Sequence, residues 1–476
     1  AEMASDEGAV PPGGTFTNPV VAENAPDPGV AWVDGAWYMV CTGRENGGSG
    51  GAFPIRRSED LVAWSEAGCV FPGDSLPAWS DGTAYWAPEI HVWGGTCLVY
   101  FTARNHDKTL CVGVATAAQP EGPYHELGSP LVEESVGAID PTFFYDADLK
   151  TQFLIWKVDG NSRGQPSVIK LRELESPTKL APGSEAVALI QSDLPWEGIV
   201  VEGPWMIKHN GEYFLFYSGA GYAGAAYCVG VARAASIYGP FTKAAAPILS
   251  QAAPDEAAVV RKWAGPGHCS VVSTDAGFLM VYHAWRADHV NRKPGRLVLL
   301  DRVEWGPGGW PVVGTAGTPT AEAQPGPELP LAVPLCLRVG SCYRLQTSQW
   351  EHIFWSGDGT ISQDACTFRV HIGRRPGGTV SLEAVSKPGQ FVRHRDSLLE
   401  LAPPDGSALF DADASFMALP GLLDGKTSSV SLRSVNYPHA WVRHRDGRLM
   451  IEAFEASDLF AHDATFVPVP VSTQRG

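Results

Sequence analysis

Five short runs of apolar and aromatic residues recur along the first part of the chain, about 60 residues apart. The runs are AWYMVCTG at Ala36, TCLVYFTAR at Thr96, QFLIWKVDG at Gln152, EYFLFYSG at Glu212 and FLMVYHAW at Phe278. Runs of this length, rich in aromatic and β-branched residues, are typical of buried β-strands. A repeat of this size with several strands is typical of a propeller blade. The sequence therefore predicts an all-β protein that begins with a five-bladed β-propeller.

A short strand that opens with proline is expected before each run. The openings are Asp27-Pro28, Ala87-Pro88-Glu89, Asp140-Pro141, Glu202-Gly203-Pro204 and Gly265-Pro266-Gly267-His268. Because the first strand of each blade lines the central channel, residues at these openings are expected to meet near one end of the axis. The polar residues concerned are Asp27, Glu89, Asp140, Glu202 and His268.

A second repeat follows a stretch that lacks strand periodicity. Residues 314–330, GTAGTPTAEAQPGPELP, are rich in Pro, Ala, Thr and Gly, which predicts a linker. Beyond it, FVRHRDSLLEL at Phe391 matches WVRHRDGRLMI at Trp441, and a weaker copy starts at Tyr343. Three lobes predict a β-trefoil. The expected organisation is a propeller over residues 1–313, the linker, and a trefoil over residues 331–476.

Charge and composition narrow the partners. The formal net charge of -17 would repel a phosphate backbone, so nucleic acid is not expected as a partner. No apolar run is long enough to span a bilayer, so no membrane partner is expected either. A neutral polymer fits this surface better. The nine cysteines include no C-x-x-C pair, which argues against a thiolate zinc site but leaves disulfide pairing open. Nothing indicates an obligate oligomer, and a monomer is expected.

Three carboxyl groups are candidates for catalysis. Glycoside hydrolysis normally needs one carboxyl group to protonate the leaving oxygen and another to activate water or attack the sugar. Asp27 lies between two prolines, whose rigidity suits a base that holds a water in line. Glu202 follows the apolar run GIVV, where burial is expected to favour the protonated acid. Asp140 would raise the pKa of that acid and orient it. Each residue alone is more often structural, but equivalent positions in the repeat favour a shared role.

The order of these motifs resembles glycoside hydrolase family 43. The motifs are DPG at Asp27, WAPE at Trp86, IDP at Ile139, EGP at Glu202, GPGH at Gly265 and GRLVLLDRVEW at Gly295, and the resemblance runs from about Phe16 to Val312. It implies a five-bladed propeller that hydrolyses arabinofuranosides or xylosides with inversion and needs no cofactor. It also implies that Asp27 is the general base, Glu202 the general acid and Asp140 the residue that tunes the acid. Inversion predicts that the carboxyl groups of Asp27 and Glu202 lie roughly 6.5 to 9.5 Å apart.

Three further candidates have competing structural explanations. Trp86 would form a sugar-stacking wall, or it packs between blades. Arg296, in the GRL motif, resembles the family arginine that reaches sugar hydroxyls, or it makes a surface ion pair. His268 aligns with an axial histidine that in some relatives helps hold calcium or another ion through water. It is therefore a candidate for substrate and metal binding, or else a satisfied core histidine.

The C-terminal repeat resembles carbohydrate-binding module family 42, whose β-trefoils bind arabinofuranose side chains. The recurring pairs are His394 with Asp413 and His444 with Asp463, each nineteen positions apart. An imidazole and a carboxylate can bracket vicinal hydroxyls, although such residues also stabilise trefoils. Ser356 replaces the histidine in the first lobe, which is therefore expected to be silent.

Together these features favour a secreted, exo-acting α-L-arabinofuranosidase that releases arabinose from plant arabinan or arabinoxylan. Its localisation is inferred from this substrate. A β-xylosidase on the same propeller is the alternative among enzymes, since the motifs do not separate the two sugars. A non-catalytic, lectin-like protein that binds arabinofuranose is the alternative outside them. Linkage stays open between α-1,5 and the α-1,2 or α-1,3 branches, with α-1,5 preferred.

Overall fold

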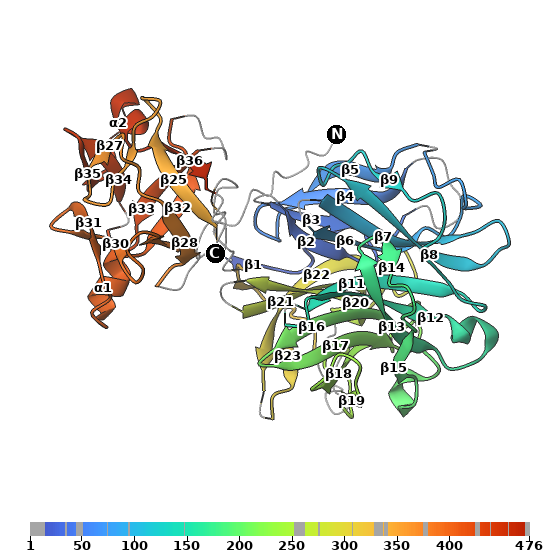
Figure 1. The fold of residues 1–476 in the computed structure, drawn as a ribbon. Coiled ribbons are helices and arrows are strands. Elements are labelled where there is room, and N and C mark those ends of the chain that lie inside the picture. The colour runs from blue at the N-terminus through green and yellow to red at the C-terminus, as the bar shows by residue number, and fades with distance from the viewer. Residues whose placement is uncertain are drawn as a thin grey trace, which may run out of the picture. The chain divides into compact units, whose positions relative to one another are not determined.

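The computed structural model shows a protein built almost entirely of antiparallel strands (Figure 1). It describes residues 15–33, 36–43, 51–73, 75–93, 96–146, 148–251, 262–274, 277–306, 308–327, 337, 341–374, 379–423, 429–437, 439–455 and 457–471. The chain divides into two compact units between residues 327 and 328. None of the helices in the described residues is long and apolar enough to cross a membrane.

Five antiparallel sheets make up the first unit. The first sheet contains β2 (Gly29–Val33), β3 (Ala36–Val40), β4 (Ala52–Ser58) and β5 (Ser65–Phe71). The second contains β6 (Trp86–Trp93), β7 (Thr96–Arg104), β8 (Leu110–Ala117), β9 (His125–Glu126) and β10 (Val132–Glu133). The third contains β11 (Ala138–Asp146), β12 (Thr151–Val158), β13 (Val168–Ser176), β14 (Lys179–Leu180) and β15 (Val187–Gln191). The fourth contains β16 (Val201–His209), β17 (Glu212–Gly219), β18 (Cys228–Ala234) and β19 (Thr242–Lys243). The fifth contains β20 (Trp263–Thr274), β21 (Gly277–Arg286), β22 (Leu297–Trp305) and β23 (Pro311–Val313).

These sheets are the five predicted blades. The aromatic runs form the second strand of each blade, and the proline-containing openings lie at the first strand. Side chains link neighbouring first strands around the ring. The hydroxyl of Ser270 on β20 accepts the amide hydrogen of Val30 on β2 at 3.1 Å and donates to the carbonyl of Pro28 at 2.7 Å. The prediction of a five-bladed propeller is confirmed.

The residue before each opening proline has a left-handed backbone. The φ angles are 57° at Asp27, 41° at Ala87, 55° at Asp140, 53° at Gly203 and 56° at Gly265. Proline has no amide hydrogen to pair, and the strand register shifts at this point in β6, β11 and β16. A β-bulge of this kind bends the strand and redirects a side chain. The left-handed residue before proline therefore recurs in every blade, and the strand register shifts beside it in three of them.

The predicted linker is partly structured. Within residues 314–330, β24 (Gln324–Pro325) pairs with β1 (Thr15–Phe16). The side-chain amide of Gln324 also donates to the carbonyl of Leu300 at 2.9 Å. These partners are distant in sequence, so local periodicity could not reveal them. Residues 328–336 lie outside the described residues, and the bounds of the three predicted segments stay a prediction.

The second unit is a closed barrel with three hairpins. Its elements are β25 (Cys342–Thr347), β26 (Phe354–Trp355), β27 (Ile361–Ser362), β28 (Phe368–Ile372), β29 (Val380–Ala384), β30 (Phe391–Arg395), β31 (Leu398–Ala402), α1 (Ala408–Asp413), β32 (Phe416–Pro420), β33 (Val430–Ser434), β34 (Ala440–Arg445), β35 (Arg448–Ala453), α2 (Asp458–Asp463) and β36 (Phe466–Pro470). Strands β25, β28, β29, β32, β33 and β36 pair in that order, and β36 returns to β25. The hairpins are β26–β27, β30–β31 and β34–β35.

Equivalent residues of the three lobes fill the barrel. One buried leucine comes from the first barrel strand of each lobe and one buried phenylalanine from the second: Leu345, Leu382 and Leu432, with Phe368, Phe416 and Phe466. The pseudo-threefold β-trefoil is confirmed.

The cysteines of the described residues are unpaired. Eight carry free thiols, and all but Cys69 are buried. Cys336 lies outside the described residues. Their burial in strand runs agrees with a role as small hydrophobic residues.

Candidate active site

A cavity of about 740 Å³ opens at the proline-containing ends of the first strands. All six sequence-predicted residues of the propeller line it: Asp27, Trp86, Asp140, Glu202, His268 and Arg296. Glu89 is also buried, but it is hydrogen-bonded to His91 at 3.0 Å and is absent from the cavity wall. The structure therefore brings together side chains that lie up to 269 positions apart.

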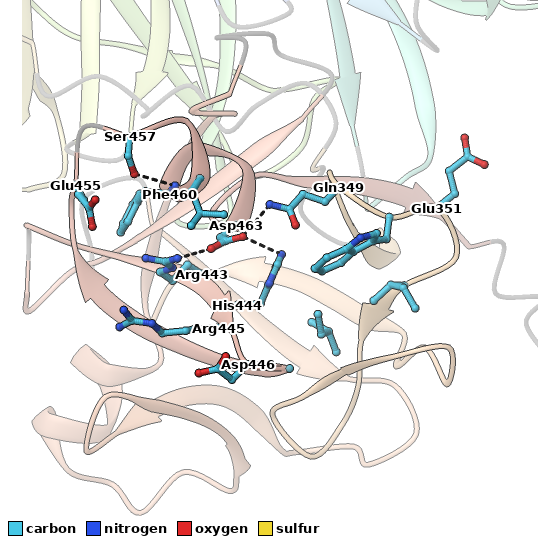
Figure 2. Close-up of a pocket in the computed structure, with 15 residues that line it drawn as sticks. Gln349, Glu351, Arg443, His444, Arg445, Asp446, Glu455, Ser457, Phe460 and Asp463 are labelled. Atoms are coloured by element: carbon cyan, nitrogen blue, oxygen red, sulfur yellow. Dashed lines mark hydrogen bonds and ion pairs between the residues drawn. The ribbon is translucent and has the colours of Figure 1, made fainter.

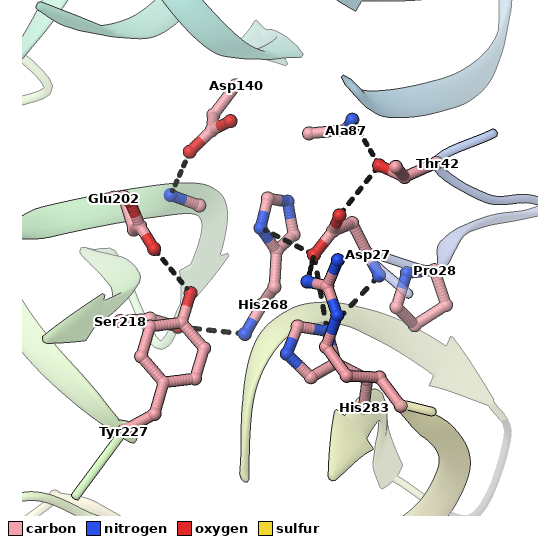
Figure 3. A network of polar contacts seen from close by, with 12 residues as sticks. Asp27, Pro28, Thr42, Ala87, Asp140, Glu202, Ser218, Tyr227, His268 and His283 are labelled. Atoms are coloured by element: carbon pink, nitrogen blue, oxygen red, sulfur yellow. Dashed lines mark hydrogen bonds and ion pairs between the residues drawn. The ribbon is translucent and has the colours of Figure 1, made fainter. Parts of the chain in front are cut away.

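Asp27 is held by hydrogen bonds at both carboxylate oxygens (Figure 3). Arg296 donates from Nη1 to Oδ1 at 2.9 Å, and the hydroxyl of Thr42 donates to Oδ2 at 2.6 Å. Thr42 accepts the amide hydrogen of Ala87 in turn, which ties the first blade to the second. The backbone amide of Asp27 donates to Nδ1 of His283 at 3.1 Å. Both the side chain and the backbone of Asp27 are therefore fixed.

The surroundings of Asp27 favour its charged form. Burial alone would raise the pKa of this carboxyl, but the positive charge of Arg296, followed by His268, holds it well below its usual range. Burial and the nearby Arg296 lower the pKa of His283 to about 4, so its imidazole is neutral and can accept the amide hydrogen. An ionised carboxylate of this kind can take a proton from water.

Glu202 and Asp140 form a second, connected group. The hydroxyl of Tyr227 donates to Oε1 of Glu202 at 2.9 Å, and Nζ of Lys157 donates to Oε2 at 2.8 Å. Asp140 accepts the amide hydrogen of Gly203 at Oδ2, 3.0 Å away, and Gly203 directly follows Glu202. Asp140 is therefore tied to the backbone that carries Glu202. In Figure 3 the ring of His268 lies between this group and Asp27.

The proton distribution in this pair differs from the sequence expectation. Burial acts on Glu202 in the expected direction, but the charge and hydrogen bond of Lys157 outweigh it and lower the pKa of Glu202. Burial and the negative charge of Glu202 raise the pKa of Asp140 to about 6, against the lowering effect of His268. The expectation that burial keeps Glu202 protonated was wrong, because it omitted Lys157. The two coupled carboxyls retain one proton between them at mildly acidic pH.

The trefoil contains a separate cavity of about 1130 Å³ around His444 and Asp463 (Figure 2). Asp463, at the end of α2, accepts from Arg443 and from Nε2 of Gln349 at 2.9 Å. Nε2 of His444 lies 3.7 Å from Oδ1 of Asp463 and has no hydrogen-bond partner in the described residues. The ring of Trp350 lies 5.2 Å from that of His444. Gln349 and Trp350 belong to the first lobe, so two lobes build this cavity.

The equivalent site around His394 and Asp413 is more fully hydrogen-bonded. Asn436 of the third lobe contacts Nε2 of His394 at 2.9 Å and donates to Oδ1 of Asp413 at 2.7 Å. The ring of Tyr437 lies 5.5 Å from that of His394 and takes the place that Trp350 has beside His444. In the first lobe, Ser356 instead bonds to Asp358 and Thr360 within its own turn. That the first lobe does not bind sugar stays a prediction.

Comparison with known proteins identifies the propeller. The model of "Glycosyl hydrolases family 43" matches residues 16–311. The chain belongs to this family. A model described as "Alpha-L-arabinofuranosidase B (ABFB) domain" matches residues 345–468 of this family 43 protein. Together, the catalytic family and the carbohydrate-binding domain make the protein a glycoside hydrolase of polysaccharide substrates.

Individual relatives align with most of this chain. A Streptomyces avermitilis protein named "Extracellular exo-alpha-(1->5)-L-arabinofuranosidase" is 28% identical over 87% of this chain and 84% of its own length. "Alpha-L-arabinofuranosidase 43" of Humicola insolens is 29% identical over 71% of this chain and 72% of its own. The crystal structure of a thermostable family-43 glycoside hydrolase is 29% identical, with a TM-score of 0.57, and the similarity covers 66% of this chain and 99% of that one.

The supporting residues have defined places in the family 43 pocket. Arg296 is buried and pairs with Asp27, so it is not a surface ion pair, and its guanidinium lies 4.7 Å from the centre of the Tyr222 ring. Trp86 lies on the cavity wall, half-buried. His268 directs Nδ1 to Asp27 at 3.4 Å. Whether these side chains contact sugar stays a prediction.

The described residues add no support for a metal site near His268. In the part of the chain that the structure describes, no group of three or more His, Cys, Asp or Glu side chains is arranged to hold a metal ion. The hydrolysis of this family needs no cofactor, since two carboxyl groups and water suffice. A calcium or other ion held by His268 through water stays a prediction.

Several residues of the family 43 pocket escaped the sequence analysis, among them Thr42, Lys157, Tyr222 and Tyr227. So did His283, which accepts the backbone amide hydrogen of Asp27 from outside the cavity wall. Lys157 carried a signal, since a lysine interrupts the apolar run QFLIWKV. Tyr227 and His283 lie outside the repeated openings, and nothing in their local sequence sets them apart from core aromatic residues.

Proposed function

We propose that this chain is a secreted, monomeric, inverting α-L-arabinofuranosidase that removes terminal arabinofuranose from arabinan or arabinoxylan. The observation that carries the proposal is the contrast between two carboxyl environments in one cavity. Asp27 is paired with Arg296, whereas Glu202 and Asp140 form a coupled group. Environments that push the pKa values of neighbouring acids apart are typical of an acid and base pair.

In the proposed reaction, Asp27 takes a proton from a water that attacks the anomeric carbon. Glu202 gives a proton to the glycosidic oxygen as the bond to the leaving sugar breaks. Asp140 supports the acid through their shared proton and through its hydrogen bond to Gly203. Attack by water opposite the leaving group inverts the anomeric configuration. The ionised state of Asp27 and its two fixed hydrogen bonds support its role as the base.

The names of the relatives support the substrate. One is called an exo-α-(1→5)-L-arabinofuranosidase and extracellular, and another an α-L-arabinofuranosidase. We therefore favour exo cleavage of α-1,5-linked arabinan outside the cell.

The trefoil would hold the polymer. In the part of the chain that the structure describes, Nε2 of His444 has no hydrogen-bond partner, and it lies in a cavity with the carboxylate of Asp463 and the ring of Trp350, which supports arabinofuranose binding there. Burial lowers the pKa of His394 and of His444, so both imidazoles are neutral near pH 7 and can accept or donate to hydroxyls. His394 with Asp413 would form a second site.

Product analysis tests the proposal. With linear α-1,5-arabino-oligosaccharides, arabinose should be the only small product, and proton NMR should detect the β-anomer first. Nitrophenyl α-L-arabinofuranoside should be cleaved in preference to nitrophenyl β-D-xyloside, the reverse preference favouring the xylosidase. Glu202→Gln should lower turnover of oligosaccharides by about 10²-fold or more, because their poor leaving group needs a proton. Wild-type turnover in this variant would exclude Glu202 as the acid.

A further inference from the structure

Lys157 is a buried charge in the cavity wall that the proposed reaction does not use. Its side chain is 1% exposed and lies on β12, the second strand of the third blade. Nζ lies 2.8 Å from Oε2 of Glu202 and 3.0 Å from Oδ1 of Asp159. Burying an ammonium group is costly unless it is paired, and these two carboxylates supply the pairing.

The position of Lys157 sets it apart from a purely structural ion pair. Neighbouring positions of β12 place apolar side chains in the core, including Ile155 and Trp156. Pairing with Asp159 alone would neutralise the ammonium group. Lys157 instead also reaches one oxygen of Glu202, while Tyr227 holds the other.

The charged and titratable groups around this contact come from several strands. Lys157 and Asp159 lie on β12 and just after it, Asp140 on β11 and Glu202 on β16, and all four line the cavity. Beyond them, His268 of β20 and the hydroxyl of Tyr227 also face Glu202. The positive charge of Lys157 is therefore shared among three carboxylates.

We propose that Lys157 is a positioning residue that orients the Glu202 carboxyl and sets the pH at which the Asp140–Glu202 pair loses its proton. The inference rests on the proposed role of Glu202 as the acid. The positive charge of Lys157 favours the ionised form of the Asp140–Glu202 pair. Asp159 weakens this effect because its carboxylate pairs with the same ammonium group. The direction of the pKa changes agrees, since burial raises the pKa of Glu202 and Lys157 lowers it.

The test is the basic limb of the pH profile of kcat/KM, which reports loss of the proton needed by the acid. The substrate is an α-1,5-arabino-oligosaccharide. Lys157→Met should move this limb to higher pH by about 1 to 3 units, the usual effect of one close opposite charge. Lys157→Arg keeps the charge and should keep the limb near its wild-type position.

Asp159→Asn supplies a second arm if Lys157→Met does not fold. It frees Lys157 to act more fully on Glu202, so the basic limb should move to lower pH. If Lys157 were merely structural, kcat/KM would be lower at all pH values, and the basic limb would not move in either variant. That result would overturn the inference. Glu202→Gln separates this inference from the proposed function. If Glu202→Gln is inactive on oligosaccharides while the basic limbs of Lys157→Met and Asp159→Asn do not move, the inference on Lys157 fails and the proposed function stands.

Discussion

Replacing Arg296 with methionine should change the acidic limb of the pH profile. The guanidinium lies 2.9 Å from the carboxylate of Asp27, and both side chains are nearly buried. Arg296 is the largest of the influences that lower the pKa of Asp27. Without it, burial raises this pKa, and the base becomes protonated at a higher pH.

The size of the shift can be bounded from the geometry. Two unit charges 2.9 Å apart interact by about 6 kcal/mol at an effective dielectric constant of about 20, and the net effect is smaller because burying both charges costs free energy. His268 and the hydroxyl of Thr42 remain and continue to favour the carboxylate. Observed effects of an adjacent arginine are about 1 to 3 pKa units. The acidic limb of kcat/KM should therefore rise by about 1 to 3 pH units, measured with nitrophenyl α-L-arabinofuranoside.

Arg296→Lys is the matched control, because it retains the positive charge and should leave the acidic limb near wild type. Loss of a sugar contact would lower kcat/KM at every pH without moving the limb, so the two effects are separable. If the acidic limb of Arg296→Met overlays that of the wild type, the carboxylate of Asp27 does not act as the base in the environment described.

Two further predictions concern the trefoil and the inner strands. His444→Ala should weaken retention on arabinoxylan in affinity electrophoresis by about tenfold and His394→Ala by less. The reason is that, among the described residues, Nε2 of His444 has no hydrogen-bond partner, whereas Nε2 of His394 is already bonded to Asn436. Retention of the double variant should fall to background. Unchanged retention of the double variant would refute both sites. Gly203→Ala should lower Tm and activity, since its φ is 53° and the new Cβ would lie 3.0 Å from Nδ1 of His268. Gly211→Ala, at a φ of 83° with open space around it, should lower Tm less and keep activity; equal effects would contradict the steric argument.

The fold was predictable because both repeats are visible in the sequence. Each blade repeats an aromatic strand and an opening proline, so five copies could be recognised without knowing their pairing partners. The trefoil followed from two nearly identical segments at Phe391 and Trp441. The pairing of β24 with β1 was missed, because it joins segments more than 300 positions apart whose sequences carry no strand pattern.

The candidate site was predictable where it coincides with a repeated position, or with a family motif as for Arg296. Asp27, Asp140 and Glu202 lie at equivalent openings, so their meeting follows from the symmetry of the blades. Lys157 lies on a second strand, where sequence gives no indication of which neighbour it pairs with. Its charge outweighs the effect of burial and lowers the pKa of Glu202, so the place of Glu202 in the cavity could be predicted but the direction of its pKa shift could not.

The backbone at the openings explains how one blade design produces two opposite carboxyl environments. Asp27 and Asp140 share a pre-proline position with almost the same φ, 57° and 55°, and both line the same cavity. Their charge states then depend on the neighbouring blades. Arg296, from the loop before β22, lies beside Asp27 and lowers its pKa, whereas burial and the negative charge of Glu202 raise the pKa of Asp140 against the charge of His268. A repeated scaffold therefore fixes where the acids lie, and residues that are not repeated, such as Arg296 and Lys157, determine which acid keeps a proton.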